Sequence, residues 1–332
     1  MLRLERRRFE RPRANLLLRV RPSHSGSWCV FLHGAGCDGA MFLHQMGVLP
    51  EDIGIVCWDA RGHGSSTLSG PFVYADMVDD LAAVLDEVCG GRAILIGQSM
   101  GGNLAQTLAA HSPDRVERLV LIDCADNHAV LSVGDRLAMR WGTPLAFRVL
   151  PWCQLVTMSA EACALRSTNI AYAALCLHKT GRRRLEQVLT SLCDALEPNP
   201  DARFSIPTLA IVGEEDRTGR VREQLRALAE RDPAVSLVEI PNAGHLANMD
   251  ATDVCSAAIT QFCSRPATDT QVSLSLPGNV RAPFGVEFIR LKISPQGAIS
   301  QRVEAQGRVS LIDMPRHRRW IGKCPQSRKE IP

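Results

Sequence analysis

Three side chains in this sequence could together produce a reactive nucleophile at neutral pH: Ser99, Asp216 and His245. A serine hydroxyl is a weak nucleophile, so it needs a base within hydrogen-bonding distance. The base needs an acidic partner that fixes its tautomer and stabilises its protonated form. The chain offers these groups in the order serine, acid, histidine, each after a run of apolar residues. We therefore predict catalysis with Ser99 as nucleophile, His245 as base and Asp216 as acid.

The serine lies in Gly97-Gln98-Ser99-Met100-Gly101, directly after the apolar run 94–96. A helical pattern begins at once with Leu104 and Ala105, which predicts a strand, a sharp turn and a helix. Glycines on both sides would leave room for a strained backbone at the serine. The hydroxyl would then stand above the edge of a sheet, and the backbone N–H of Met100 would be the first oxyanion donor.

The acid and the base each have rivals in the sequence. Glu214 and Glu215 precede Asp216, but the shorter aspartate comes last in its turn and is preferred. His245 follows the apolar run 235–240 and stands beside Gly244. Surface or structural roles are sufficient to explain the eight other histidines, so His245 is preferred as the base.

A second oxyanion donor is expected in the loop after the predicted strand 28–32. The N–H of Ala35 is our choice, with Gly36 as a close alternative. Each such donor typically contributes ~10²–10³ in rate. We expect His33 to shape this loop by hydrogen bonding rather than to transfer protons, and the turn 59–62 to support it.

Hydrophobic patterning indicates the elements that position these residues. Strands are predicted at 2–9, 16–20, 28–32, 53–58, 94–96, 116–122, 208–212 and 235–240, with amphipathic helices at 77–88, 104–109, 221–228 and 253–262. Strands that alternate with helices favour an α/β fold with a doubly wound, mostly parallel sheet covered on both faces.

This alternation stops between residues 125 and 204. Helices are predicted there at 130–141, 145–157, 160–178 and 182–196. We interpret the segment as a helical cap, or lid, over the strand ends. It supplies Trp141 and Trp152, which with Gly36 are candidate substrate contacts, although both tryptophans also suit the interior of the lid. The predicted divisions are a core in two parts, 1–124 and 205–264, the cap 125–204, and an extension 265–332.

Composition narrows the class of protein. The 332 residues carry a net charge of +3, which gives no argument for nucleic acid or an anionic membrane. No apolar run approaches the length of a membrane span. The twelve cysteines show neither a CxxC pair nor metal-type spacing. We therefore predict no metal and no cofactor, and a cytoplasmic protein, with an arginine-rich transit peptide as the alternative.

The extension 265–332 differs from the rest of the chain. This segment contains twelve Lys and Arg residues and five Asp and Glu residues, which gives a net charge of +7. We expect a poorly ordered basic segment. A small β appendage, a contact with nucleic acid or a protein partner, and a sequence of unnatural origin remain open alternatives.

Five motifs in order resemble the α/β-hydrolase fold superfamily over about residues 14–264. They are His33-Gly34, Asp59-x-Arg61-Gly62-x-Gly64, Gly97-x-Ser99-x-Gly101-Gly102, Gly213-x-x-Asp216 and Gly244-His245. The resemblance implies an eight-stranded sheet, a helical cap after the sixth strand, and a Ser99–Asp216–His245 triad. Residues 244–250 are similar to a loop of the 3-oxoadipate enol-lactonases and their esterase relatives. Haloalkane dehalogenases and epoxide hydrolases carry an aspartate where Ser99 stands, which disfavours them.

The resulting hypothesis is a serine hydrolase that cleaves a small carboxylic ester or lactone through an acyl-enzyme on Ser99. One alternative is acyl transfer to an acceptor other than water, or perhydrolysis, with the same three residues. Another is a small-molecule receptor of the same fold with negligible turnover. No nucleic-acid or membrane partner is predicted, and a homodimer is left open.

Overall fold

A computed structural model of the chain describes residues 2–264. The extension 265–332, for which poor order is predicted, lies outside the described residues. Within the described part, no helix combines the length and the apolar character that crossing a membrane would require.

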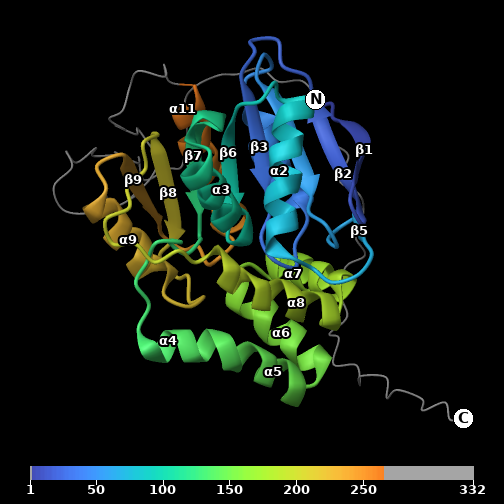
Figure 1. The fold of residues 1–332 in the computed structure, drawn as a ribbon, viewed down its shortest axis with the longest axis vertical. Helices are drawn as coiled ribbons and strands as arrows, with labels where there is room; N and C mark the ends of the chain where they lie inside the picture. The colour runs from blue at the N-terminus through green and yellow to red at the C-terminus, as the bar shows by residue number, and fades with distance from the viewer. Residues whose placement is uncertain (1, 265–332) are drawn as a thin grey trace, which may run out of the picture. The chain divides into compact units, whose positions relative to one another are not determined.

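A single mixed sheet forms the centre of this part (Figure 1). Its main path follows the order β1-β2-β4-β3-β6-β7-β8-β9, and β1 and β2 are the antiparallel strands at one end. A two-residue strand, β5, pairs with β2 beside this path. The bounds are β1 (Glu5–Arg11), β2 (Ala14–Arg21), β3 (Trp28–Leu32), β4 (Gly54–Asp59), β5 (Thr67–Leu68), β6 (Ala93–Gln98), β7 (Val116–Ile122), β8 (Thr208–Gly213) and β9 (Val235–Ile240). The predicted α/β class with a mostly parallel sheet is confirmed.

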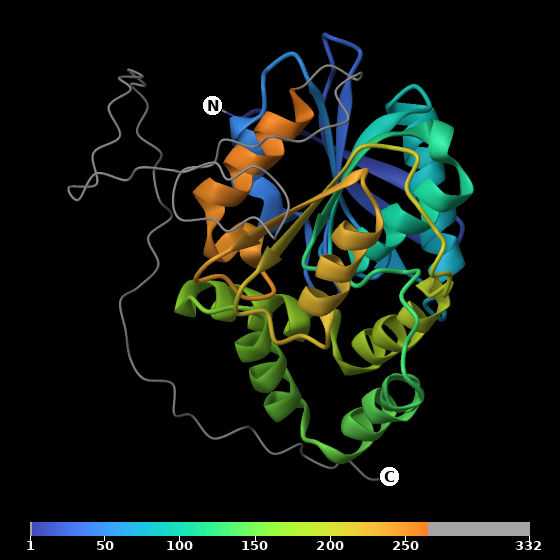
Figure 2. The same ribbon diagram turned by 90° about the vertical axis from the view of Figure 1, so that its left-hand side faces the viewer.

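Helices cover both faces of the sheet. One face packs against α2 (Tyr74–Val88), α3 (Met100–His111) and α9 (Val221–Arg231), and the other against α1 (Leu43–Val48) and α11 (Thr252–Cys263). Figure 2 shows the sheet between α2 and α3 on one side and α1 and α11 on the other. Every residue of β6 and of β8 is buried and most are apolar, as expected for parallel strands that are covered on both faces.

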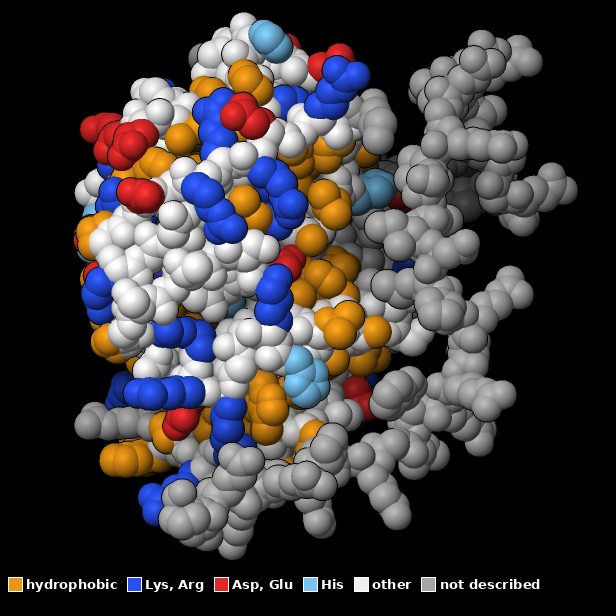
Figure 3. Space-filling model, turned by 90° about the vertical axis from the view of Figure 1, so that its right-hand side faces the viewer, with side chains coloured by type: hydrophobic (Ala, Val, Ile, Leu, Met, Phe, Trp, Pro, Cys, Tyr) orange, Lys and Arg blue, Asp and Glu red, His pale blue; other side chains and the backbone are white. Residues whose placement is uncertain are grey.

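The edge strand β1 has a different composition. Its sequence is Glu-Arg-Arg-Arg-Phe-Glu-Arg, and its first four residues are exposed. Figure 3 shows the face of the molecule on this side, with Lys and Arg side chains spread over it. Charged side chains on an edge strand discourage pairing with a second sheet.

The chain between β7 and β8 contains helices and no strand. They are α4 (Val133–Leu137), the π-helical η3 (Ala138–Gly142), α5 (Thr143–Val149), α6 (Trp152–Cys163), α7 (Ser167–Thr180), α8 (Arg182–Ser191) and the 3₁₀ turn η4 (Leu192–Ala195). We call residues 133–195 the helical insertion. Both ribbon views place it at one end of the sheet (Figures 1 and 2).

The predicted helix 145–157 is wrong, because the chain bends inside it. Helix α5 ends at Val149, and α6 begins at Trp152. Pro151 stands between them and has no backbone N–H to continue the first helix. A residue before proline is also driven to extended angles, and Leu150 has φ −84° and ψ 142°.

The predicted helix 160–178 is also wrong, because it is broken at residues 164–166. Ala164 is extended, with φ −140° and ψ 155°. The N–H groups of Leu165 and Arg166 donate to the carboxylate of Asp250, at 2.9 and 3.3 Å. An acceptor 84 to 85 residues further along the chain replaces the helical carbonyls, so the apolar pattern of the segment could not reveal this break.

Candidate active site

The turn between β6 and α3 holds Ser99 in a strained conformation. Its φ is 50° and its ψ is −119°, which L-residues rarely adopt. A Cβ at Gly97 would lie 2.3 Å from the carbonyl oxygen of Gly101, and one at Gly101 would lie 2.0 Å from that of Leu32. Both positions therefore require glycine, and the chain turns there sharply enough to lift the serine above the strand.

The structure brings the serine, histidine and aspartate together from three separate loops. Nε2 of His245 lies 3.0 Å from Oγ of Ser99, and its Nδ1 lies 2.8 Å from Oδ2 of Asp216. These loops follow β6, β9 and β8, whose carboxyl ends meet at one edge of the sheet. Both His245 and Asp216 are buried.

The hydrogen bonds decide the tautomer of His245. A carboxylate only accepts, so Nδ1 carries the proton that Asp216 binds, and Nε2 is left to accept the Ser99 hydroxyl proton. Burial acts to lower the pKa of His245, but the hydrogen bond and charge of Asp216 and the charge of Asp123 outweigh it, so the pKa is raised above 6.5. The imidazole is therefore a stronger base than in water.

The loop after β3 is shaped by His33. Its Nε2 accepts from the N–H of Ala60 at 2.9 Å, so Nδ1 carries the proton and donates to the carbonyl of Gly34 at 2.8 Å. Burial lowers the pKa of His33 and keeps the ring neutral. Among the described residues, no acceptor is bonded to the N–H of Ala35 or of Met100. Both groups are therefore available to an oxyanion.

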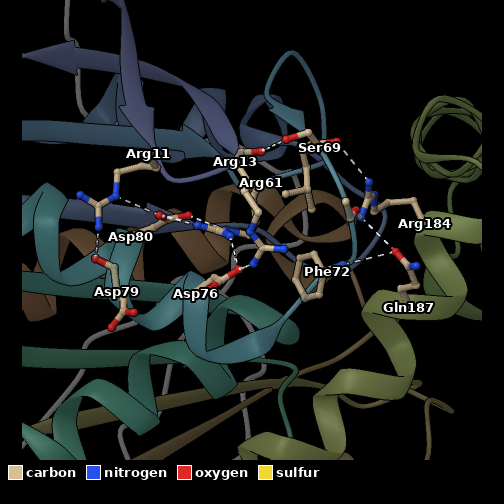
Figure 4. Close-up of polar contacts among 12 residues, drawn as sticks. Arg11, Arg13, Arg61, Ser69, Phe72, Asp76, Asp79, Asp80, Arg184 and Gln187 are labelled. Atoms are coloured by element: carbon tan, nitrogen blue, oxygen red, sulfur yellow. Dashed lines mark hydrogen bonds and ion pairs between the residues drawn. The ribbon is translucent and has the colours of Figure 1, made fainter.

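The turn after β4 is a rigid support for this loop. Asp59 accepts from the N–H groups of Gly39 and Ser65, at 3.0 and 2.8 Å. The guanidinium of Arg61 is buried and donates twice to Asp80, at 2.8 Å in each case. Figure 4 shows this arginine between the carboxylates of Asp80 and Asp76.

The three predicted substrate contacts have different surroundings. A Cβ on Gly36 would lie 2.5 Å from Leu177 Cδ2 of α7, so this glycine lets the loop after β3 pack against the helical insertion. Trp152 packs against Phe147 inside the insertion, with 6.4 Å between ring centroids. Trp141 is 62% exposed. Contact with a substrate stays a prediction for all three.

Sequence reasoning missed Asp123, at the end of β7. Its Oδ1 accepts from the N–H of Gly213 at 2.8 Å, and its Oδ2 from that of Ala247 at 2.9 Å. It therefore ties the turn that leads to Asp216 to the loop that carries His245. Burial raises the pKa of Asp123 to about 7. The available signal was an acidic residue directly after a buried strand. A related signal, an acidic residue in the turn after a strand, identified Asp216.

Gln98 and Asp250 were also missed. Nε2 of Gln98 donates to the carbonyl of His245 at 2.7 Å. Asp250 accepts from the N–H of Gly244 at 3.0 Å. Both bonds act on the backbone beside the histidine, and no local pattern in the sequence distinguishes such bonds. Within residues 2–264, no three His, Cys, Asp or Glu side chains are placed to share a metal ion.

Comparison with known proteins places the chain in a family. Residues 29–258 match the model of the Alpha/beta hydrolase family, and the chain belongs to that family. The resemblance seen in the five motifs is therefore confirmed.

Individual relatives agree with this placement. The chain is 25% identical to 3-oxoadipate enol-lactonase 2 of Acinetobacter baylyi, over 71% of this chain and 88% of the relative. It is 28% identical to the sn-1-specific diacylglycerol lipase ABHD11 of Mus musculus, over 70% of this chain and 80% of that protein. The crystal structure of the enol-lactonase from Burkholderia xenovorans LB400 superposes with a TM-score of 0.66 at 22% identity, covering 76% of this chain and 97% of that one. The last likeness concerns the fold alone.

Proposed function

We propose that this chain is a serine hydrolase that cleaves a carboxylic ester or lactone through an acyl-enzyme on Ser99. The observation that carries the proposal is the pair of contacts made by one imidazole, 3.0 Å to the Ser99 hydroxyl and 2.8 Å to the Asp216 carboxylate. Family membership, together with relatives named as a lactonase and a lipase, supports a hydrolase of ester-type bonds.

The first half-reaction forms the acyl-enzyme. Oγ of Ser99 attacks the carbonyl carbon while Nε2 of His245 takes the hydroxyl proton. The negative charge moves to the former carbonyl oxygen, where the N–H groups of Ala35 and Met100 stabilise it. When the tetrahedral intermediate collapses, the C–O bond to the leaving alcohol breaks and Nε2 returns the proton to that oxygen.

The second half-reaction uses water. Nε2 of His245 takes a proton from water, and the resulting hydroxide attacks the acyl carbon. The intermediate collapses with release of the acid, and Ser99 regains its proton. Asp216 keeps Nδ1–H in place and stabilises the imidazolium that forms in each half-reaction.

The helical insertion is proposed to act as the cap that shapes the substrate pocket. Two contacts support this role: Leu177 of α7 lies against Gly36, and the N–H of Leu246 donates to the carbonyl of Cys163 at 2.8 Å. A panel of short-chain esters, long-chain esters and lactones would define the acyl group that this pocket accepts.

The test of the mechanism is a pair of substitutions at the two ends of α3. Ser99→Ala should lose up to ~10⁶ of kcat on p-nitrophenyl esters. Ser112→Ala, at the far end of the helix, should retain wild-type kcat. Equal turnover by Ser99→Ala and the wild-type protein would refute the proposed nucleophile.

A further inference from the structure

The loop that carries His245 is held from two directions. On the core side, Nε2 of Gln98 donates to the carbonyl of His245 at 2.7 Å. On the other side, the N–H of Leu246 donates to the carbonyl of Cys163, the last residue of α6, at 2.8 Å. The residue after the imidazole is therefore bonded directly to the helical insertion.

Asp250 makes a second connection between the same two segments. The residue is fully buried, and its carboxylate accepts four N–H groups. Oδ2 accepts from Gly244 at 3.0 Å and from Leu165 at 2.9 Å. Oδ1 accepts from Arg166 at 3.3 Å and from the side chain of Asn169 at 2.8 Å. Three of the four donors thus belong to the insertion, and the fourth directly precedes the histidine.

Close packing leaves these segments little freedom to move apart. A Cβ on Gly244 would lie 3.3 Å from Oδ2 of Asp250 and 3.3 Å from the carbonyl oxygen of Cys163. In the turn 164–166, the N–H groups of Leu165 and Arg166 donate to this carboxylate and not to helical carbonyls. Hydrogen bonds to a carboxylate are stronger than those between neutral groups, so four of them make a strong connection for so few residues.

We propose that Asp250 and the turn 164–166 position His245, so that the place of the imidazole depends on the helical insertion. The proposal rests on the proposed role of His245 as the base. When α6 and α7 shift, they carry Gly244 and Leu246 with them, and the contact of Nε2 with the Ser99 hydroxyl is lost. A substrate that holds these helices against the sheet therefore completes the site to which it binds. Because a misplacement of about 1 Å can cost ~10² in rate, small movements are sufficient.

The first test changes the insertion side only. Asn169→Ala removes one donor to Asp250 from within α7, and Ser167→Ala is a matched control at an exposed position of the same helix. With a p-nitrophenyl ester, Asn169→Ala should lower kcat about 10-fold and leave KM within about 2-fold, because the change acts on the base. Ser167→Ala should change neither constant. A change in KM alone would refute the proposal, since it would mean that the insertion acts on substrate binding.

The second readout needs no turnover. The Nδ1 proton of His245, bound to Asp216, should give a far-downfield proton NMR signal that disappears in His245→Ala. Asn169→Ala and Asp250→Asn should shift or broaden this signal, and Ser167→Ala should preserve it. If Ser99→Ala retained esterase activity, the proposed function would be refuted. The NMR signal would still show whether Asp250 and the turn 164–166 position His245.

Circular dichroism would identify any variant that does not fold. Asn169→Ala is the milder change, because alanine has a high helix propensity. If Asp250→Asn does not fold, Asn169→Ala alone tests the positioning of His245. A folded Asn169→Ala with wild-type kcat and an unchanged signal would overturn the proposal. A lowered kcat with an unchanged signal would overturn it as well.

Discussion

Asp123→Asn is the substitution that tests most sharply how the core holds the proposed triad. The wild-type carboxylate accepts the N–H groups of Gly213 and Ala247, at 2.8 and 2.9 Å. Asparagine has one acceptor oxygen, so one of these N–H groups must face an NH₂ group instead. A buried donor left without a partner costs about 1–3 kcal/mol, and we expect the free energy of unfolding to fall by that amount.

The same change should alter the pH dependence of activity. The negative charge of Asp123 is one of the causes that raise the pKa of His245. Asp123 carries this charge above its pKa of about 7 and asparagine carries none, so the pKa of His245 should fall in the variant. Neutral imidazole is the form that accepts the Ser99 proton, and the acid limb of kcat/KM should therefore move to lower pH.

Asp232→Asn is the matched control for this experiment. Asp232 is also buried, and it accepts from the N–H groups of Phe204 and Ala234 at 2.6 and 2.9 Å. The Asp232→Asn variant should show a similar fall in the free energy of unfolding, measured by urea denaturation. The acid limb of its kcat/KM profile should not move. An acid limb that stays in place or moves to higher pH in Asp123→Asn would refute the electrostatic reasoning.

Three further outcomes follow from the same contacts. Gly101→Ala should lower the free energy of unfolding by more than the ~1–3 kcal/mol usual for overpacking. The reason is that the new Cβ would lie 2.0 Å from the carbonyl oxygen of Leu32. A denaturant midpoint equal to that of the wild-type protein would contradict this. Arg61→Met should lower the free energy of unfolding by about 1–3 kcal/mol, because it removes two bonds from the buried Asp80 carboxylate and leaves the one from Arg11. An unshifted thermal midpoint would contradict this. Asp216→Asn should lower kcat by ~10⁴, because the amide can donate to Nδ1 of His245 and so favours the wrong tautomer of the imidazole. Unimpaired steady-state turnover by this variant would show that Asp216 is not the acid of the triad.

The sequence was sufficient for the parts of the fold that depend on local pattern. Apolar runs such as 116–122 predicted the buried strands, because a parallel strand shows its burial in its own composition. The glycines around Ser99, between an apolar run and a helical pattern, predicted the sharp turn. The contact of residues 99, 216 and 245 could be expected because strands of one parallel sheet end at the same edge.

The parts that the sequence did not predict depend on bonds between distant backbone segments. The break at 164–166 needs the carboxylate of Asp250, and the loop of His245 needs Asp123. An aspartate that binds backbone N–H groups imposes no requirement on the side chains of its partners, so no pattern marks the pairing. Pro151 is different, because it lacks the backbone N–H that would continue α5. Its position in the sequence was therefore sufficient to predict the end of that helix.

The most direct measurement of the central claim is the mass of the protein during turnover. Wild-type protein, quenched with acid while it hydrolyses a p-nitrophenyl ester, should carry one acyl group, and peptide mapping should place it on Ser99. Ser99→Ala should carry none. An acyl group on another residue of the wild-type protein, or ester turnover by Ser99→Ala at the wild-type rate, would contradict the account.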